Sequence, residues 1–123
     1  MTLGEIIKRA DRKKPNDFSM EDKIQWIAEL DGQIALNVMM MSIEDVKQFR
    51  YTEDDVDVEP LVEFPHDKMY EYYVQAQIDF DNGEYNKYQN SSAMFNSLYQ
   101  DFLRWFANTY DPVQEDDEEE SGE

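Results

Sequence analysis

The chain has 123 residues, no cysteine and a formal net charge of −18 at pH 7. This length suits a single domain, the lack of cysteine excludes disulfides and thiolate metal sites, and the negative charge disfavours binding to DNA phosphates or anionic membranes. The N-terminal residues are too polar for a secretory signal, and no uncharged apolar run approaches the ~20 residues that span a bilayer. We therefore expect a soluble protein that is made in the cytoplasm and has no membrane partner.

The first part of the chain predicts two helices separated by a proline. Thr2 and Glu5 have the spacing of a capping box, and they begin a short helix that ends near Lys13, ahead of Pro15. Ser19 precedes acidic residues as an N-cap and begins a longer helix. The apolar positions of this second helix recur at helical steps: Ile24, Ile27, Leu30, Ile34, Val38 and Met41. The pattern predicts that the second helix continues through the last of these residues.

A long loop is predicted in the middle of the chain. Ser42 is expected to cap a further turn or two of helix that ends at Phe49. Residues 50–64 then lose the helical period and gather acidic residues, which predicts a loop of about fifteen residues. Its apolar side chains either pack down on the fold or add a short extended strand to a partner: Val56, Val58, Leu61, Val62 and Phe64.

The segment 64–110 contains thirteen of the seventeen aromatic residues and predicts two further helices. The third helix begins after Pro65 and ends at Asn82 and Gly83, which have the character of a helix C-cap. The fourth begins near Glu84, and its broad apolar face includes Tyr88, Ser92, Phe95, Tyr99, Phe102 and Phe106. A helix with so broad an apolar face packs on two partners in its own fold or on one in another subunit.

These elements predict an all-α protein, a small helical bundle of about four helices with a long middle loop. The bundle forms one domain over residues 1–112. Residues 113–123 contain seven of the 29 acidic residues and a single apolar residue. Such a composition cannot collapse, so we expect a disordered acidic C-terminal tail.

No residue pattern indicates catalysis. Residues 79–84 are similar to the start of a calcium loop, but the glycine stands at position five instead of six and no glutamate follows at position twelve. His66 is the only histidine, and it is expected to be a helix-start residue rather than a general base. We therefore predict that the protein is not an enzyme and has no catalytic, cofactor-binding or metal-binding residues. The loop acids either are solvated or hold a divalent cation between subunits: Asp54, Asp55 and Asp57.

The surplus of aromatic residues and methionines predicts an interface with other protein chains. Aromatic side chains bury large areas and are enriched where subunits meet. Met39, Met40 and Met41 cover most of a helical turn and suit either an adaptable interface or ordinary core filling. We expect some of the aromatic side chains to divide between the bundle core and a neighbouring subunit. The candidate interface residues are Met39, Met40, Tyr99, Phe102, Trp105, Phe106 and Tyr110.

Two stretches carry a resemblance to a known family. Residues 12–34 and 65–110 resemble the head-tail connector proteins of tailed bacteriophages and prophages, also called adaptor or head-completion proteins. The resemblance is most specific at Pro15-Asn16, at residues 23–32 and at the corner formed by residues 82–85. It continues through several residues of the fourth helix: Tyr88, Asn90, Phe95, Asn96 and Tyr99.

The resemblance implies a small α-helical protein of the virion neck, made in the cytoplasm of the host bacterium. Such proteins form a ring, typically a dodecamer, beneath the portal protein. The ring extends the DNA channel and provides the docking surface for stopper or tail-completion proteins. The candidate interface residues would then contact a neighbouring subunit or the portal. The acidic composition agrees with this role, since genomic DNA must slide through the channel without specific binding.

Two alternative functions remain open at the level of the sequence. An acidic DNA mimic would inhibit a DNA-binding protein by copying the spacing of phosphates with its surface carboxylates; the charge suits this function, whereas the aromatic surplus does not. A small helical enzyme or metal-binding regulator would use the Asp and Glu residues as its working groups. The partner identity separates the first alternative from a connector, and saturable heat in a titration with divalent cations would identify the second.

Overall fold

The computed structural model describes residues 1–110, and all regular secondary structure in this range is helical. This confirms the all-α prediction for the described residues. The predicted acidic tail, residues 113–123, lies outside them. The elements are α1 (Leu3–Lys13), α2 (Met20–Asn37), α3 (Ile43–Val46), the 3-10 turns η1 (Lys47–Phe49) and η2 (Glu53–Asp55), α4 (Lys68–Asp81) and α5 (Tyr85–Tyr110).

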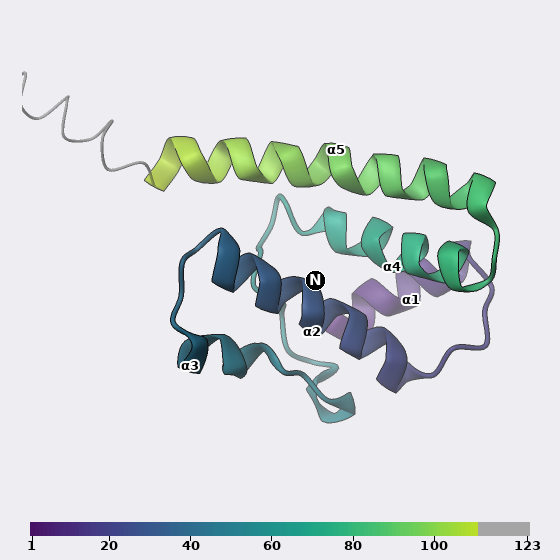
Figure 1. Cartoon of the computed structure of the whole chain (residues 1–123). Helices are drawn as coiled ribbons and strands as arrows, with labels where there is room; N and C mark the ends of the chain where they lie inside the picture. The colour runs from purple at the N-terminus through teal and green to yellow at the C-terminus, as the bar shows by residue number, and fades with distance from the viewer. Residues whose placement is uncertain (111–123) are drawn as a thin grey trace, which may run out of the picture.

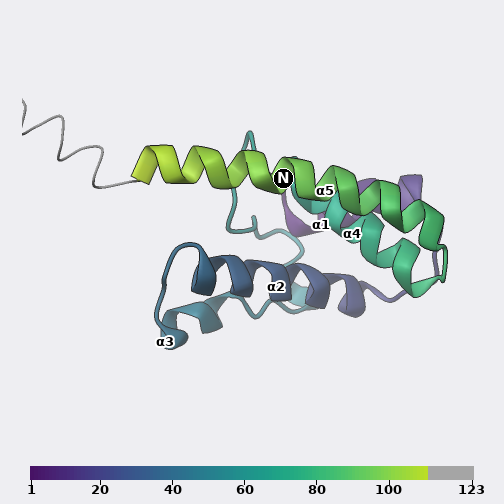
Figure 2. The same ribbon diagram turned by 45° about the horizontal axis from the view of Figure 1, so that its top comes forward.

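The helices form layers around α4 (Figure 1). α5 runs antiparallel to α4 along one side, while α1 and α2 pack against α4 from the other side. Figure 2 shows α5 as the outermost layer, opposite α2 and α3. The core lies between α1, α2 and α4, and it is built mostly of aliphatic side chains: Leu3, Ile6, Ile7, Ile24, Ile27, Ile34, Met69, Val74 and Ile78. α5 contributes one fully buried aromatic ring, Phe102.

Deleting residues 113–123 is expected to leave the fold intact. Within residues 1–110, the buried residues of the core cluster lie between Leu3 and Phe102, so the deletion leaves all of these residues in place. The truncated protein should unfold cooperatively, at a midpoint within about 2 °C of the full chain when followed by circular dichroism. A truncated chain that unfolds without a cooperative transition would contradict this prediction.

Most helix ends lie where the sequence predicts them. At α1, the Thr2 hydroxyl accepts a hydrogen bond from the Glu5 amide at 3.1 Å, and the Glu5 carboxylate accepts one from the Thr2 amide at 2.8 Å. The Ser19 hydroxyl accepts from the Asp22 amide at 3.0 Å at the start of α2. These side chains satisfy amide groups that the first turn of a helix leaves without partners. α4 ends at Asp81, and Gly83 follows with the left-handed backbone, φ 75°, that this type of helix end requires.

The predicted end of α2 is wrong. The apolar spacing predicts a helix through Met41, whereas α2 ends at Asn37. The chain turns back after Val38: the Met41 amide donates to the Ala35 carbonyl at 2.9 Å, and Met40 takes a left-handed backbone with φ 57°. Glycine usually occupies such a position, so the sequence contains no stop signal here. Side chains beyond the helix end still pack on the core, which is why the apolar period continues past it.

Replacing Met40 by glycine is expected to stabilise the protein. Met40 has a left-handed backbone and its side chain is 79% exposed, so glycine relieves the strain and loses little packing. We expect the free energy of unfolding to rise by about 0.5–1 kcal/mol in urea titrations. Met39→Gly is the matched control, because Met39 packs partly on the core and has no left-handed backbone. Its free energy of unfolding should fall; a fall in Met40→Gly as well would contradict the strain argument.

The middle loop packs down on the start of α1. The amides of Leu3 and Gly4 donate to the carbonyls of Val58 at 2.8 Å and Val56 at 2.9 Å. A Cβ atom at Gly4 would lie 3.1 Å from the Val56 carbonyl oxygen, so a larger residue there would push the loop away by a few tenths of an ångström. Val62 is buried in the core. The predicted loop over residues 50–64 therefore contains one short 3-10 turn, η2, and covers the end of the bundle.

A buried carboxylate fixes this loop to the bundle. Asp31 on α2 has no exposed surface, and its side chain accepts hydrogen bonds from the Tyr51 hydroxyl at 2.7 Å, the Leu61 amide at 2.9 Å and the Tyr70 hydroxyl at 2.5 Å. The Tyr70 hydroxyl in turn accepts from the Val62 amide at 2.8 Å. Burial raises the pKa of Asp31, and the three hydrogen bonds act in the opposite direction. One side chain thus connects α2, α4 and both ends of the loop.

The same network makes stability depend on alkaline pH. Burial, together with the neighbouring Asp31, raises the pKa of both Tyr51 and Tyr70 above the ordinary value of 10.0. The unfolded chain loses these protons near pH 10 and the folded chain holds them, so their contribution to stability is complete below pH 10 and falls as the pH rises above it.

We expect the free energy of unfolding, measured by urea titration, to decrease as the pH rises from about 10 to 11. In a Tyr51→Phe/Tyr70→Phe variant the protein should be less stable at pH 8 and the alkaline decrease should be smaller. Tyr85→Phe is the control, because Tyr85 is exposed and its hydroxyl makes no hydrogen bond to Asp31. An alkaline decrease of equal size in the double variant would show that these tyrosines do not cause it.

Candidate functional site

The structure places most of the predicted interface residues around one hollow. The hollow has a volume of about 390 Å³ and lies between the C-terminal part of α5 and the segment that precedes α4. We call it the aromatic hollow. Its lining residues are Met39, Leu61, Val62, Glu63, Phe64, His66, Phe102, Trp105 and Phe106. Four of the seven candidate interface residues are therefore brought together here.

The unequal lengths of two antiparallel helices create this hollow. α5 has 26 residues and α4 has 14, so α5 is about 18 Å longer at the usual helical rise. The short connection holds the end of α4 beside the start of α5, and the last turns of α5 therefore extend past the first residue of α4 (Figure 1). These turns lie over residues 61–66 instead of over a helix. Aromatic side chains on this part of α5 face a loop that covers them only in part.

A row of aromatic contacts leads from α4 along α5 to the hollow. The Tyr73 and Phe95 rings lie 5.1 Å apart, Phe95 and Tyr99 stack at 5.4 Å, and Tyr99 and Phe102 stack at 6.3 Å. Burial raises the pKa of the Tyr99 hydroxyl. Ring pairs at such distances stabilise each other beyond the area that they bury. The row holds the rings of α5 in fixed positions.

The hollow itself combines one buried ring with exposed ones. Phe102 is 1% exposed and belongs to the core, so its ring forms the floor of the hollow rather than free surface. Trp105 is 43% exposed and Phe64 is 86% exposed. The His66 ring lies 5.0 Å from the Trp105 ring and 5.9 Å from the Phe102 ring. Rigid aromatic rings that remain in contact with solvent are typical of binding hot spots in protein interfaces.

The remaining predicted interface residues lie outside the lining of the hollow. Met40 is exposed at the end of α2, beside Met39 but not in the hollow. Tyr99 is half-buried one turn before Phe102 on α5. Tyr110 is the last residue of α5, and its side chain lies outside the part of the chain that the structure describes.

Phe64 and His66 were not predicted as interface residues. The sequence assigns Phe64 to the loop and His66 to the start of the third helix, and His66 does lie in the turn before α4. The short connection between the two predicted helices could have identified both residues from the sequence. Two antiparallel helices joined by a short turn bring the start of the first near the end of the second. Residues just before α4 therefore lie near residues 102–106 of α5.

The residues of the calcium-like segment have structural roles. Asp79 is buried, and one of its carboxylate oxygens accepts from Lys14 Nζ at 3.1 Å and from the Ser91 hydroxyl at 2.9 Å. The carboxylate thus joins α4 to the end of α1 and to α5. Within residues 1–110, no group of three or more His, Cys, Asp or Glu side chains could hold a metal ion. Among the described helices, none is long and apolar enough to cross a membrane.

No protein-family model, no curated protein and no solved structure matches the chain. The aromatic hollow offers rings, a thioether and aliphatic groups, with a carboxylate and an imidazole at its border. This composition suits the apolar side chains of another protein.

Proposed function

We propose that the protein is a head-tail connector of a tailed bacteriophage or prophage. In this role it is a structural, non-enzymatic component of the virion neck. Its copies form a ring, typically a dodecamer, beneath the portal protein. The ring extends the DNA channel and provides a docking surface for stopper or tail-completion proteins. The protein would be made in the cytoplasm of the host bacterium and act in the assembled particle.

The observation that carries this proposal is the aromatic hollow at the end of α5. A monomeric domain of this size gains little from leaving Phe64 and Trp105 in contact with water, since burying such rings stabilises a fold. A protein that assembles with others needs such a surface. The His66 and Phe102 rings lie against the Trp105 ring and restrict it before binding, which reduces the entropy lost when a partner docks.

The charge supports the same proposal. With a net charge of −18 the protein repels phosphates, which suits a wall along which DNA slides and does not suit a DNA-binding surface. Apolar contacts persist when salt screens surface charges. We therefore expect portal binding through the aromatic hollow to survive washing at high salt.

Affinity capture from the source cells tests the proposal. The tagged full-length protein is captured after induction or infection, washed in about 0.5 M salt, and its partners are identified by mass spectrometry. We expect to recover a portal protein together with other neck or tail components. A nuclease or a repressor that is captured in low salt and released by the wash in about 0.5 M salt would instead identify an acidic DNA mimic. Recovery of no portal protein would contradict the connector proposal.

Matched variants connect the partner to the hollow. Phe64→Ser/Trp105→Ser removes the exposed rings, and we expect it to reduce the recovered portal protein by more than about tenfold. Phe80→Ser is the control, because Phe80 is an exposed aromatic residue at the opposite end of α4. Portal recovery should be unchanged in the control. Equal losses in both variants would show that the hollow is not the docking surface.

A further inference from the structure

The outer side of α1 carries a concentration of positive charge in an acidic protein. Five of the eleven Lys and Arg residues fall between positions 8 and 14, and the other six are dispersed along the chain. Lys13 and Lys14 form salt bridges with the buried carboxylates of Glu71 at 3.3 Å and Asp79 at 3.1 Å. The other three cations are exposed and form what we call the cationic face: Lys8, Arg9 and Arg12.

The cationic face forms no salt bridge within residues 1–110, although the Glu5 carboxylate, one turn before Arg9 on α1, interacts with the charge of Arg9. Arg12 lies three residues from Arg9 and four from Lys8, so the three side chains share one side of the helix. This side is opposite the apolar residues of α1 that enter the core. None of the three forms a salt bridge with another described residue. The three cations are exposed and no salt bridge among the described residues holds them, so they can contact another molecule.

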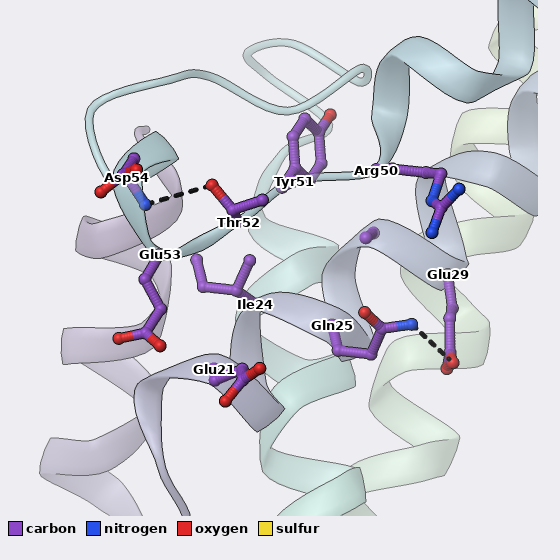
Figure 3. A pocket seen from close by; sticks show the side chains of 10 residues that line it. Glu21, Ile24, Gln25, Glu29, Arg50, Tyr51, Thr52, Glu53 and Asp54 are labelled. Carbon is purple, nitrogen blue, oxygen red and sulfur yellow. Dashed lines mark hydrogen bonds between the residues drawn. The ribbon is translucent and has the colours of Figure 1, made fainter.

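A groove of opposite charge lies between α2 and the residues that follow η1. It has a volume of about 680 Å³, and Ile24, Ala28 and Tyr51 contribute to its lining. Figure 3 shows Glu21 and Glu53 on one side of this groove, and Glu29 with Arg50 on the other. We call it the acidic groove. Its carboxylates belong to Glu21, Glu29, Glu53 and Asp54, and none of them forms a salt bridge within the described residues.

We propose that the cationic face of one copy of the chain docks into the acidic groove of a second copy, head to tail. Two copies with a net charge of −18 repel each other, so they can approach only where a local positive surface meets a negative one. The two surfaces consist of different residues on different elements, so the contact between copies joins unlike surfaces. A contact between two different surfaces propagates around a ring, whereas a contact between identical surfaces ends at a dimer.

The inference rests on the proposed function in one respect, because a ring requires a repeated contact between copies. The second copy is favoured over a nucleic acid as the occupant of the cationic face. Three cations give only a weak attraction to phosphates, and the remaining surface of the protein repels them. The acidic groove is lined by four carboxylates, and guanidinium groups that enter it can form charge-assisted hydrogen bonds with them.

Charge exchange between two variants of the full chain tests the proposal. Arg9→Glu/Arg12→Glu reverses the cationic face, and Glu29→Lys/Glu53→Lys reverses the acidic groove. Sedimentation velocity should show self-association of the unaltered protein in about 50 mM salt that weakens more than about tenfold in 500 mM salt. Each variant alone should stay monomeric in low salt. An equimolar mixture of the two should associate again, because each reversed surface then faces its complement.

Circular dichroism of each variant verifies that the exchanged side chains leave the fold unchanged. A protein that is monomeric in low salt at its highest soluble concentration would overturn the inference. So would variants that associate as strongly as the unaltered chain, a mixture that stays monomeric, or retention of nucleic acid by the cationic face in place of a second copy. If the charge exchange fails while the portal protein is still captured, the self-contact lies elsewhere and the connector proposal stands. If the exchange succeeds and no portal is captured, only the connector proposal fails.

Discussion

Replacing Asp31 by alanine is expected to lower the free energy of unfolding by about 3–5 kcal/mol. The carboxylate is fully buried and accepts hydrogen bonds from two tyrosine hydroxyls and the Leu61 amide. Alanine leaves these three donors without their acceptor and removes the connection between α2 and the middle loop. Urea titration followed by circular dichroism measures the change.

Two further variants distinguish the loss of the Asp31 hydrogen bonds from the general effect of removing a negative charge. Asp31→Asn keeps the size of the side chain and one acceptor oxygen. We therefore expect it to lower the free energy of unfolding by about 1–3 kcal/mol, which is less than for Asp31→Ala. Asp17→Ala removes a carboxylate from an exposed connection and should change stability by less than about 0.5 kcal/mol. If Asp31→Ala were as mild as Asp17→Ala, the buried carboxylate would not be what holds the loop to the bundle.

Replacing Phe102 by alanine is expected to destabilise the protein by about 3–5 kcal/mol, because a fully buried phenylalanine leaves a large cavity. Phe102 is 1% exposed and contacts the rings of His66, Tyr99, Trp105 and Phe106. Trp105→Ala should lower stability by only about 1–2 kcal/mol, since its side chain is 43% exposed. Urea titrations of the two variants measure both changes.

The two positions are also expected to differ in assembly. Trp105→Ala should retain the fold and lose portal capture, whereas Phe102→Ala should lose capture only to the extent that the fold is lost. If Trp105→Ala changed neither stability nor assembly, the division of this aromatic group between the core and a partner would be wrong.

Local signals in the sequence predict much of the fold. The capping box at Thr2, the N-cap at Ser19 and the helix stop at Gly83 each act over a few residues, and all three are confirmed. The end of α2 was not predictable in the same way. Met40 takes a left-handed backbone at which the sequence has no glycine, and Val38 and Met39 pack on the core although they lie past the helix end.

The buried network depends on contacts between distant parts of the chain, which local patterns do not contain. Asp31 stands seven residues after Ile24 and three before Ile34, so it occupies a position on the apolar face of α2. A carboxylate on that face is a signal of a buried polar contact. Its partners, Tyr51 and Tyr70, lie twenty and thirty-nine residues away, and only the fold identifies them.

The aromatic hollow was predicted in part. The broad apolar face of the last helix identifies Phe102, Trp105 and Phe106, but periodicity does not separate the buried ring from the exposed ones. That division depends on how far α5 extends past α4 and on which loop residues face it. Phe64 enters the site for this reason, although it lies thirty-eight or more residues before the α5 residues of the hollow.

The most direct test of the connector proposal is a density map of the neck of particles produced by the source phage or prophage. We expect a ring of copies of this chain against the portal, with the helices of residues 1–110 fitting the density and the aromatic hollow in contact with a neighbouring protein. A neck whose density is fully explained by other proteins, in particles that lack this chain, would contradict it.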